Sequence, residues 1–359
     1  MQILKLVRKK IPPFVTGSLE TTAGRAPVIA TDWSGADFQG MIKSRISAFR
    51  MNYSVLPGLY AVGTPDGNSD VFVSANYKLS FDILRRSLKG MHAWVLVLDT
   101  NSINVWCAAG KGTMGTEELI KRITAARLDA VVVHKRIILP QLSAVGICAS
   151  AVQKQTGFRV SFGPVEARDI PDYVRAGYKK TEKMRIIQFP MLDRMVLTPM
   201  ELNPAMKKFP WFAGGTLIWA GLQPSGILFT DAWTKGLPII MLLLISVFSG
   251  AFVTPVLLPF IPFRSFAIKG WITGMLLLML SVQAFGILEH ADVFLLSAVY
   301  LFLPMLSSYL ALQFTGATTY TGMSGVKKEL KIAVPIYISA STIAGLMMIG
   351  IKLREWGLV

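Results

Sequence analysis

Long apolar runs follow Lys208, whereas Lys, Arg, Asp and Glu are common before it and scarce after it. A transmembrane helix needs about 20 mostly apolar residues. Four runs qualify with few or no charges, at residues 237–263, 271–288, 293–314 and 332–351, and a fifth at 211–229 is diluted by Gly, Gln, Pro and Ser. We therefore expect an all-α transmembrane domain of about five helices over residues 209–359, with its first span the weakest.

The distribution of charge bears on partners and on orientation. The formal net charge is +16, but the basic residues are scattered, and no basic stripe with interleaved aromatic residues indicates binding of nucleic acid. Cytoplasmic loops of membrane proteins favour Lys and Arg. The basic loops at Arg264 and Lys327 fall on one side of the predicted spans. We expect that side to be cytoplasmic, on a multi-pass protein of the inner (cytoplasmic) membrane with the lipid bilayer as a partner. Lys352 and Arg354 would lie outside after five spans and inside after four, and the sequence leaves this open.

Residues 1–24 are expected to be a basic N-terminal arm, with cations at Lys5, Arg8, Lys9 and Lys10. A signal peptide would need an apolar core of about 7 to 15 residues after those charges, which the sequence does not supply. Inside the predicted spans, charged residues of the kind that mark ion pathways are lacking, which argues against a transporter. A membrane sensor or transporter with a cytoplasmic ligand-binding domain is kept as the alternative outside enzymes.

Residues 25–208 show the alternation of an α/β domain. Short β-branched runs at residues 71–74, 93–99, 130–133 and 159–162 are typical of strands, and segments 81–88, 117–128 and 142–156 are typical of helices. Strands that alternate with helices indicate a parallel sheet with right-handed crossovers. We therefore predict a Rossmann-like or flavodoxin-like domain, whose ligands bind beyond the carboxyl ends of the strands.

The motif that follows the predicted strand 93–99 is the most informative one. Residues 104–111 read Asn-Val-Trp-Cys-Ala-Ala-Gly-Lys, and Cys107 is one of two cysteines in the chain. A phosphate loop is excluded, because Val105 and Gly112 stand where that loop needs a Gly and a Ser or Thr. A dinucleotide site is disfavoured, because the predicted strand 130–133 is followed by His134 and not by an acidic residue. From residue types alone, Cys107 is also compatible with a small buried hydrophobic residue.

Residues 104–111 closely resemble the cap-helix signature of the HgcA family, the corrinoid proteins of microbial mercury methylation. Three further strings, at residues 57–66, 74–82 and 163–171, are similar to that family and to the corrinoid domain of corrinoid iron–sulfur proteins. The resemblance covers residues 25–200, and a membrane tail follows it in the family too. It implies a cytoplasmic corrinoid-binding domain at residues 25–208 and a corrinoid-dependent methyltransferase that passes a methyl group to inorganic Hg(II), giving methylmercury.

The resemblance also implies roles for individual residues. Cys107 would be the catalytic residue and the lower axial ligand to the cobalt of a cobalamin-type corrinoid. A thiolate is a soft, strong donor, which would favour transfer of the methyl group with its electron pair to Hg(II). Asn104 would cap the helix, and the helix N-terminus would stabilise the thiolate. The implied cofactor-binding residues are Ser74 and Asn76, which would bind corrin amides, and Asn104, Val105, Trp106, Cys107, Ala108, Ala109, Gly110 and Lys111.

The cysteine content implies partners. Cys107 and Cys148 are the only cysteines, and a 4Fe–4S cluster needs about four thiolates, so the chain cannot hold one. The resemblance implies a small ferredoxin with 4Fe–4S clusters (HgcB-like) and a methyl donor such as methyltetrahydrofolate or its methyltransferase. Cys148 lies in an apolar run and is expected in the core. The alternative enzyme function is a corrinoid methyl carrier of acetyl-CoA (C1) metabolism.

Overall fold

The computed structural model describes residues 12–288, 291–316, 318 and 320–358. The chain forms two compact units, Met1–Gln188 and Phe189–Val359. The structural boundary therefore lies before the change in composition at Lys208. Residues 189–208 join the second unit because they pack against its helices: Arg194 Nε donates a hydrogen bond to the Val256 carbonyl at 3.0 Å, and Leu202 packs on Val247.

A seven-stranded mixed sheet forms the centre of the first unit, in the order β1-β2-β3-β5-β4-β6-β7. The strands are β1 (Val15–Thr21), β2 (Gly24–Ile29), β3 (Gly58–Val62), β4 (Val71–Ala75), β5 (Ala93–Leu98), β6 (Arg136–Leu139) and β7 (Arg159–Phe162). β5, β4, β6 and β7 run parallel to one another, whereas β3 is antiparallel to β5, and β1 is antiparallel to β2. Three of the four predicted strands, at residues 71–74, 93–99 and 159–162, are thus confirmed in this parallel set, and β6 is its fourth strand. An extension that includes antiparallel pairs adds three strands.

The strands β1 to β3 were not predicted. β1 lies inside the expected arm 1–24, so that part of the arm is an ordered strand, hydrogen-bonded to β2. Residues 1–11, with the predicted basic cluster, lie outside the described residues. β1 and β2 carry Thr, Gly and Arg at positions that face solvent, and this edge position gives a weak apolar pattern.

Two further predictions for this unit were wrong. Residues 128–131 form a helical turn, α6, and the strand starts at Arg136, because Arg127 takes a left-handed conformation (φ 47°) that reverses the chain. Of the predicted helix 142–156, only α7 (Ala149–Thr156) forms. A Cβ added at Gly146 would lie 2.5 Å from the Met114 carbonyl, so the chain there passes close to another backbone segment instead of continuing a helix.

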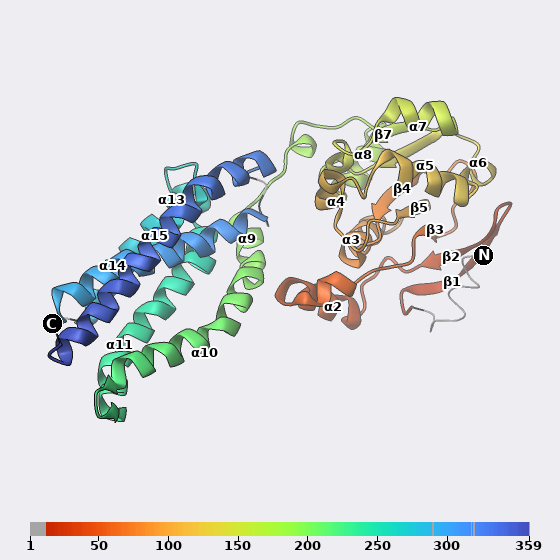
Figure 1. Ribbon diagram of the computed structural model, residues 1–359. Helices are drawn as coiled ribbons and strands as arrows, with labels where there is room; N and C mark the ends of the chain where they lie inside the picture. Colours follow the sequence, from red (N-terminus) through yellow and green to blue (C-terminus); the bar gives the residue numbers. More distant parts are fainter. Residues whose placement is uncertain (1–11, 289–290, 317, 319, 359) are drawn as a thin grey trace. The chain divides into compact units, whose positions relative to one another are not determined.

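Helices cover both faces of the sheet (Figure 1). On one face, α4 (Val105–Lys111), α5 (Thr116–Ala125) and α7 pack on a core that includes Leu96, Ala108 and Leu119. On the other, α3 (Lys78–Ser87) and α8 (Ile170–Arg175) pack on a core that includes Phe72 and Phe81. The helix α2 (Gly35–Ile46) and the 3-10 turn η1 (Ala48–Asn52) connect β2 to β3. The resulting layers leave the carboxyl ends of the parallel strands next to α4.

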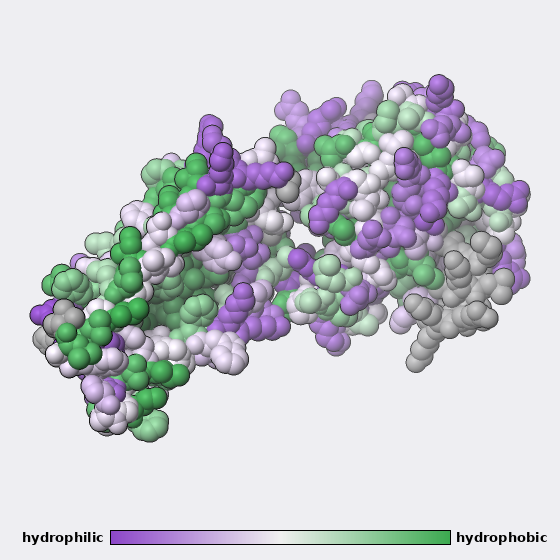
Figure 2. Space-filling view, viewed as in Figure 1, coloured by the Kyte–Doolittle hydropathy of each residue, from purple (hydrophilic) through white to green (hydrophobic). Residues whose placement is uncertain are grey.

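In its described residues, the second unit has five long helices, α10 (Pro199–Gly221), α11 (Phe229–Phe248), α13 (Phe266–Phe285), α14 (Val293–Gln313) and α15 (Met323–Glu355), after a short α9 (Met191–Leu197). The helix α11 continues through a π-helical turn, η5 (Ser249–Val253), into α12 (Thr254–Val256). Four segments of the described chain are long and apolar enough to cross a membrane: Phe229–Val256, Phe266–Phe285, Val293–Gly316 and Ser324–Glu355. Apolar side chains dominate much of the surface of this unit in Figure 2.

The predicted first span, residues 211–229, is not one helix. The helix α10 ends at Gly221, the short strands β8 (Leu222–Gln223) and β9 (Gly226–Ile227) form a hairpin, and α11 begins at Phe229. Pro224 and Ser225 form the turn, and Gly226, the first residue of β9, has a φ of 127° that few other residues adopt. The residues that dilute this apolar run therefore make a turn between two helices.

The helix α10 nevertheless runs the length of α11 in the opposite direction. Gly221 packs against Ala232, and Gly236 packs against Leu217. At the other end, Arg194, just before α10, bonds to Val256, just after α11. The unit thus starts at one end of the helix bundle.

The chain leaves this bundle at the end opposite to the one where it enters. Lys352 Nζ, in the last turn of α15, donates to the Ala220 carbonyl at 3.2 Å, and Trp219 Nε1 donates to the Met348 carbonyl at 3.1 Å. The charge of Lys352 is paired at this end of the bundle, because its Nζ lies 2.7 Å from a carboxylate oxygen of Glu355. Five helices therefore traverse the bundle, although four of them meet the length and composition of a membrane span.

Candidate functional site

A groove of about 720 Å³ opens at the carboxyl ends of the parallel strands. Ser74 at the end of β4, Leu139 at the end of β6 and Gly163 after β7 line it, together with residues of α3 such as Ile83. In chain order, the parallel strands β5-β4-β6-β7 are the second, first, third and fourth, so the direction of winding reverses between β4 and β6. Ligands of open α/β sheets bind at such a switch point, and the groove lies there.

The helix α4 forms at this edge as its sequence predicts. Asn104 has extended backbone, and its Oδ1 accepts a hydrogen bond from the Cys107 N–H at 3.0 Å. Gly112 ends the helix in the left-handed conformation, with φ 80°. The predicted helix start at Asn104, with Cys107 in the first turn, is confirmed.

The residues of the 104–111 motif face different directions. Asn104, Val105 and Trp106 line the groove. The Cys107 side chain is half-buried, and its thiol forms no disulfide. Gly110 and Lys111 are exposed.

Ala108 and Ala109 face the interior of the domain. Ala108 is 0% exposed and belongs to the core beneath α4, and Ala109 is 5% exposed. The Ala109 backbone passes close to Gly146, where a Cβ would lie 3.1 Å from the Ala109 carbonyl oxygen. The small size of these two residues therefore lets α4 approach its own domain.

Asn76 is buried beneath the loop that leads into α4. Its Oδ1 accepts hydrogen bonds from the Thr100 N–H at 3.0 Å, the Thr100 hydroxyl at 2.8 Å and the Ser102 N–H at 3.0 Å. Its Nδ2 donates to Asp99 Oδ1 at 3.1 Å. These bonds hold two residues, Asn101 and Ser102, at positive φ of 55° and 61°. Asn76 thus fixes the entry to the cap helix, and its polar atoms already have partners within the protein.

The second cysteine differs from its expected place. Cys148 is exposed and precedes α7, and its N–H donates to Thr116 Oγ1 at 2.8 Å. A hydrogen bond with the Ser150 hydroxyl lowers the pKa of the Cys148 thiol. The prediction of a core cysteine was wrong, because the run that contains it folds as a turn and not as an apolar helix.

His134 lies in the loop just before β6, at the amino end of that strand and away from the carboxyl ends where the groove lies. Its Nε2 lies 2.9 Å from the Ser69 carbonyl, and its Nδ1 accepts from the Arg136 N–H at 3.2 Å. Both ring nitrogens of His134 therefore have backbone partners within the protein.

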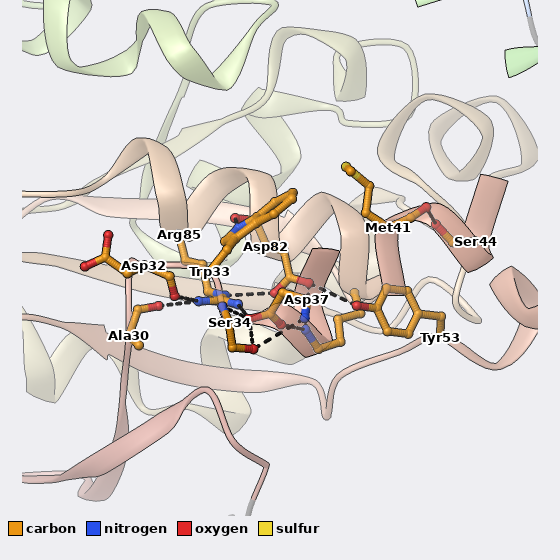
Figure 3. A network of polar contacts seen from close by, with 11 residues as sticks. Ala30, Asp32, Trp33, Ser34, Asp37, Met41, Ser44, Tyr53, Asp82 and Arg85 are labelled. Atoms are coloured by element: carbon orange, nitrogen blue, oxygen red, sulfur yellow. Dashed lines mark hydrogen bonds and ion pairs between the residues drawn. The ribbon is translucent and has the colours of Figure 1, made fainter. Parts of the chain in front are cut away.

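A buried network of charged side chains joins α2 to α3 (Figure 3). No pattern of residue types in the sequence predicts this network. Arg85 is 0% exposed and lies 2.8 Å from Asp82 and 2.9 Å from Asp37. Its Nη1 also donates to the Ala30 carbonyl at 2.6 Å. Lys78 lies 2.7 Å from Asp37 and 2.6 Å from Asp82. The two cations thus form ion pairs with the two carboxylates in a site that is almost entirely buried.

Asp37 also begins α2. The Ser34 hydroxyl and the Asp37 side chain form a reciprocal capping box at the start of this helix. Burial acts to raise the pKa of Asp37, but the hydrogen bonds from Lys78 and Ser34 outweigh it and hold that pKa well below its ordinary value. Asp37 is therefore ionised at neutral pH, and it anchors α2 to the rest of the unit.

Comparison with known proteins identifies relatives of the segment that contains this site. Residues 48–174 match the family of the CO dehydrogenase/acetyl-CoA synthase delta subunit. The acetyl-CoA decarbonylase/synthase complex subunit gamma of Methanothermobacter thermautotrophicus is 31% identical over 127 residues, which are 35% of this chain and 27% of that protein. The corresponding subunit of Methanocaldococcus jannaschii is 29% identical over 136 residues, 37% of this chain and 28% of that protein.

Another relative is named for a corrinoid. The corrinoid/iron-sulfur protein large subunit of Moorella thermoacetica is 28% identical over 120 residues, which are 33% of this chain and 26% of that protein. The chain thus spans about a quarter of the length of the curated relatives it matches. The matched segment includes β3 to β7, α4 and all the lining residues of the groove except Trp33. Residues 48–174 are therefore related to the corrinoid-linked proteins of the CO dehydrogenase/acetyl-CoA synthase type.

Proposed function

We propose that this chain is a membrane-anchored corrinoid protein that transfers a methyl group, with the Cys107 thiolate as the lower ligand to cobalt. The observation that carries the proposal is the position of Cys107. It is a half-buried free thiol in the first turn of a helix at the switch point of the sheet, inside a segment related to a corrinoid/iron-sulfur protein.

The residues around the groove fit such a cofactor. A bound corrinoid supplies a cobalt centre that can carry a methyl group. Cys107 offers a soft sulfur donor on a helix fixed at both ends by Asn104 and Gly112. Val105, Trp106 and Ser74 line a mostly apolar groove, which would exclude water from a large flat ligand, whereas Cys107 follows Trp106 on the same helix and is not one of the lining residues. Asn76 would hold Cys107 in place through the loop before α4 instead of binding the ring itself.

The methyl acceptor has two candidates. Hg(II) is proposed from the resemblance of residues 104–111, because a soft thiolate ligand suits transfer of a methyl group to a soft electrophile. The second candidate is an acceptor in C1 metabolism, with this chain as the corrinoid methyl carrier. The comparisons favour it more directly, since the relatives are subunits of acetyl-CoA decarbonylase/synthase complexes. In either case a small iron–sulfur protein and a methyl donor such as methyltetrahydrofolate are the proposed partners.

The second unit would anchor the protein in the inner membrane, with the corrinoid domain in the cytoplasm. The bundle end that carries Arg264, Lys327 and Lys328 also holds the connection to the first unit, and its basic residues favour a cytoplasmic location. Five traversals then place the end of α15 outside. The pairing of Lys352 with Glu355 reduces the cost of this arrangement.

The acceptor is tested with membranes from a host that expresses the chain. These membranes receive cobalamin, methyltetrahydrofolate with its methyltransferase, a reduced low-potential ferredoxin and Hg(II), and methylmercury is measured. We expect methylmercury from the wild type and from Cys148→Ala, and none above background from Cys107→Ala. If the wild type binds cobalamin through Cys107 but forms no methylmercury, the mercury assignment is wrong and the C1 carrier is the remaining candidate.

A further inference from the structure

The groove at the carboxyl ends of the strands extends beyond α4. On one side it follows α3, where Ser80, Ile83 and Ser87 line it from one face of that helix. At the rise of an α-helix, these three residues span about 10 Å along the helix axis. Most of the groove lining is apolar, so this part of the groove suits a planar apolar group. The groove therefore has room for more of a ligand than the part that meets α4.

Trp33 forms a further wall of the groove. It lies between β2 and α2, and among the described residues that line the groove it alone stands outside residues 48–174, the segment that matches the family. The Trp33 Nε1 donates a hydrogen bond to the Asp82 carbonyl at 2.9 Å, which fixes the ring against α3 (Figure 3). The family match therefore does not account for this wall of the groove.

Arg86 brings an uncompensated positive charge to the groove. Of the described residues, three charged ones line it: Arg86, Glu166 and Arg168. Arg168 Nε lies 2.6 Å from a carboxylate oxygen of Glu166, so these two charges compensate each other. The Arg86 guanidinium instead lies over aromatic rings, with its central carbon 5.1 Å from the centre of the Trp33 ring and 5.9 Å from that of Phe38. An arginine held against a ring keeps its N–H groups available for an oxygen ligand.

A group with one negative charge and a planar apolar part would complement this end of the groove. Cobalamin carries such a group, because its lower base is tethered to the corrin ring through a phosphodiester. In the proposed function Cys107 takes the lower position on cobalt, so the base leaves the metal, and the base and its tether need another place. Arginine binds phosphate oxygens through two parallel N–H donors.

We propose that Arg86 binds the phosphodiester of the nucleotide tail of cobalamin, and that the displaced base lies along α3 in the apolar part of the groove. Arg86 thereby selects complete cobalamin over a corrinoid that lacks this tail. Trp33 is a positioning residue, which acts through Arg86. The proposal rests on corrinoid binding in the proposed function, but it is independent of the methyl acceptor and of the membrane.

The test compares three corrinoids on the full chain in detergent, with Kd measured from the change in visible absorption on binding. They are cobalamin, cobinamide phosphate, which keeps a phosphate but lacks the base, and cobinamide, which lacks both. Arg86→Gln should raise the Kd of cobalamin and of cobinamide phosphate about tenfold, and leave that of cobinamide within about twofold. The cost of removing the base from cobalt belongs to free cobalamin, so it is the same for every variant and cancels in this comparison.

Arg168→Gln is the matched control. It removes the same charge from the same groove, but Arg168 is already paired with Glu166, so we expect each of the three Kd values to change by less than about twofold. Trp33→Leu removes the ring beneath the guanidinium. It should raise the Kd of cobalamin about threefold and leave that of cobinamide unchanged.

Equal weakening of cobalamin and cobinamide by Arg86→Gln would overturn the proposal, and so would unchanged binding of all three corrinoids. An effect on cobalamin that spares cobinamide phosphate would also overturn it, because Arg86 would then contact the base and not the phosphate. The same losses in Arg168→Gln would show a general effect of charge in the groove. A wild type that binds none of the three corrinoids would instead refute the proposed function, so the two failures are distinguishable.

Discussion

At the scale of single residues, the helix α4 is held by one contact between neighbours in the sequence and by others between distant residues. Only the first kind can be predicted from the sequence. Asn104 and Cys107 are three residues apart, and the helix start could be predicted from residue types alone. Asn76 and Thr100 are 24 residues apart, and only the fold brings them together. The sequence therefore indicated the thiol, whereas Asn76 was singled out by the resemblance as a cofactor-binding residue and not as the residue that positions the helix.

Asn76→Ala is predicted to loosen the entry to the cap helix. It removes one acceptor from three hydrogen bonds and leaves buried donors unpaired, at about 1–3 kcal/mol for each group. Hydrogen–deuterium exchange of residues 99–108 should speed up, and the sulfur–cobalt absorption of added cobalamin should weaken, while exchange in β4 and β6 stays unchanged. Asn68→Ala, on an exposed loop, is the control. An unchanged absorption spectrum with faster exchange would show that the loop does not position Cys107.

Ala108 is one of the residues that the resemblance implies for cofactor binding. In the structure its side chain is 0% exposed and belongs to the core beneath α4. An Ala108→Leu substitution should therefore overpack the interior and destabilise the unit, at about 1–3 kcal/mol, even without any cofactor.

At the scale of elements, the sequence predicted those strands that are buried on both faces of the sheet, because such strands are continuous apolar runs. β4 and β5 are buried along their whole length and were recognised. β1 is the edge strand with β2 next to it, and the helix α2 buries Asp37, Gly40 and Ser44 while Phe38 and Ile42 are exposed, so neither follows the usual relation between pattern and burial. The α2 to α3 network was invisible in sequence, because its carboxylates and cations lie up to 48 residues apart.

Asp37→Asn is predicted to release α2. It leaves Lys78 and Arg85 with one carboxylate between them, and breaking a buried ion pair costs about 3 kcal/mol or more. Exchange of residues 35–46 should speed up strongly, while that of α5 should not. Lys89→Ala is the control, since its pair with Asp32 is largely exposed and should change little.

The same network sets a pH dependence. Because the pKa of Asp37 is lowered in the folded protein, its contribution to stability is present above the ordinary carboxylate pKa and is lost as the pH falls through the folded value. Between neutral pH and mildly acidic pH, the attachment of α2 should therefore stay constant in the wild type. A loosening of residues 35–46 between pH 7 and pH 5 would contradict the lowered pKa.

At the scale of the whole molecule, composition correctly separated an α/β unit from a helical one but placed the boundary too late. The charged residues of α9 and the first turns of α10 look like part of the first unit, yet Arg194 and Leu202 pack within the second. Hydropathy predicted about five helices but misplaced the first one, since α10 begins at Pro199, carries Lys207 and Lys208, and is recognised only by its packing along α11.

If five helices cross the membrane, the side on which an introduced cysteine reacts can be predicted. Single cysteines are placed in a Cys107→Ala/Cys148→Ala background. Ser225→Cys and Leu358→Cys should react with an impermeant maleimide from outside, because both lie at the end of the bundle with Ala220 and Lys352. Lys328→Cys should react only after the membrane is opened. Labelling of Ser225→Cys and Leu358→Cys from opposite sides would refute this arrangement.

The central claim for the whole molecule is that cobalt binds through Cys107, and the visible spectrum of cobalamin bound to the full chain tests it most directly. The wild type and Cys148→Ala should both give the base-off, sulfur-ligated spectrum at one cobalamin per chain. Cys107→Ala should lose that spectrum while keeping its circular dichroism. The same sulfur-ligated spectrum in Cys107→Ala would contradict the account.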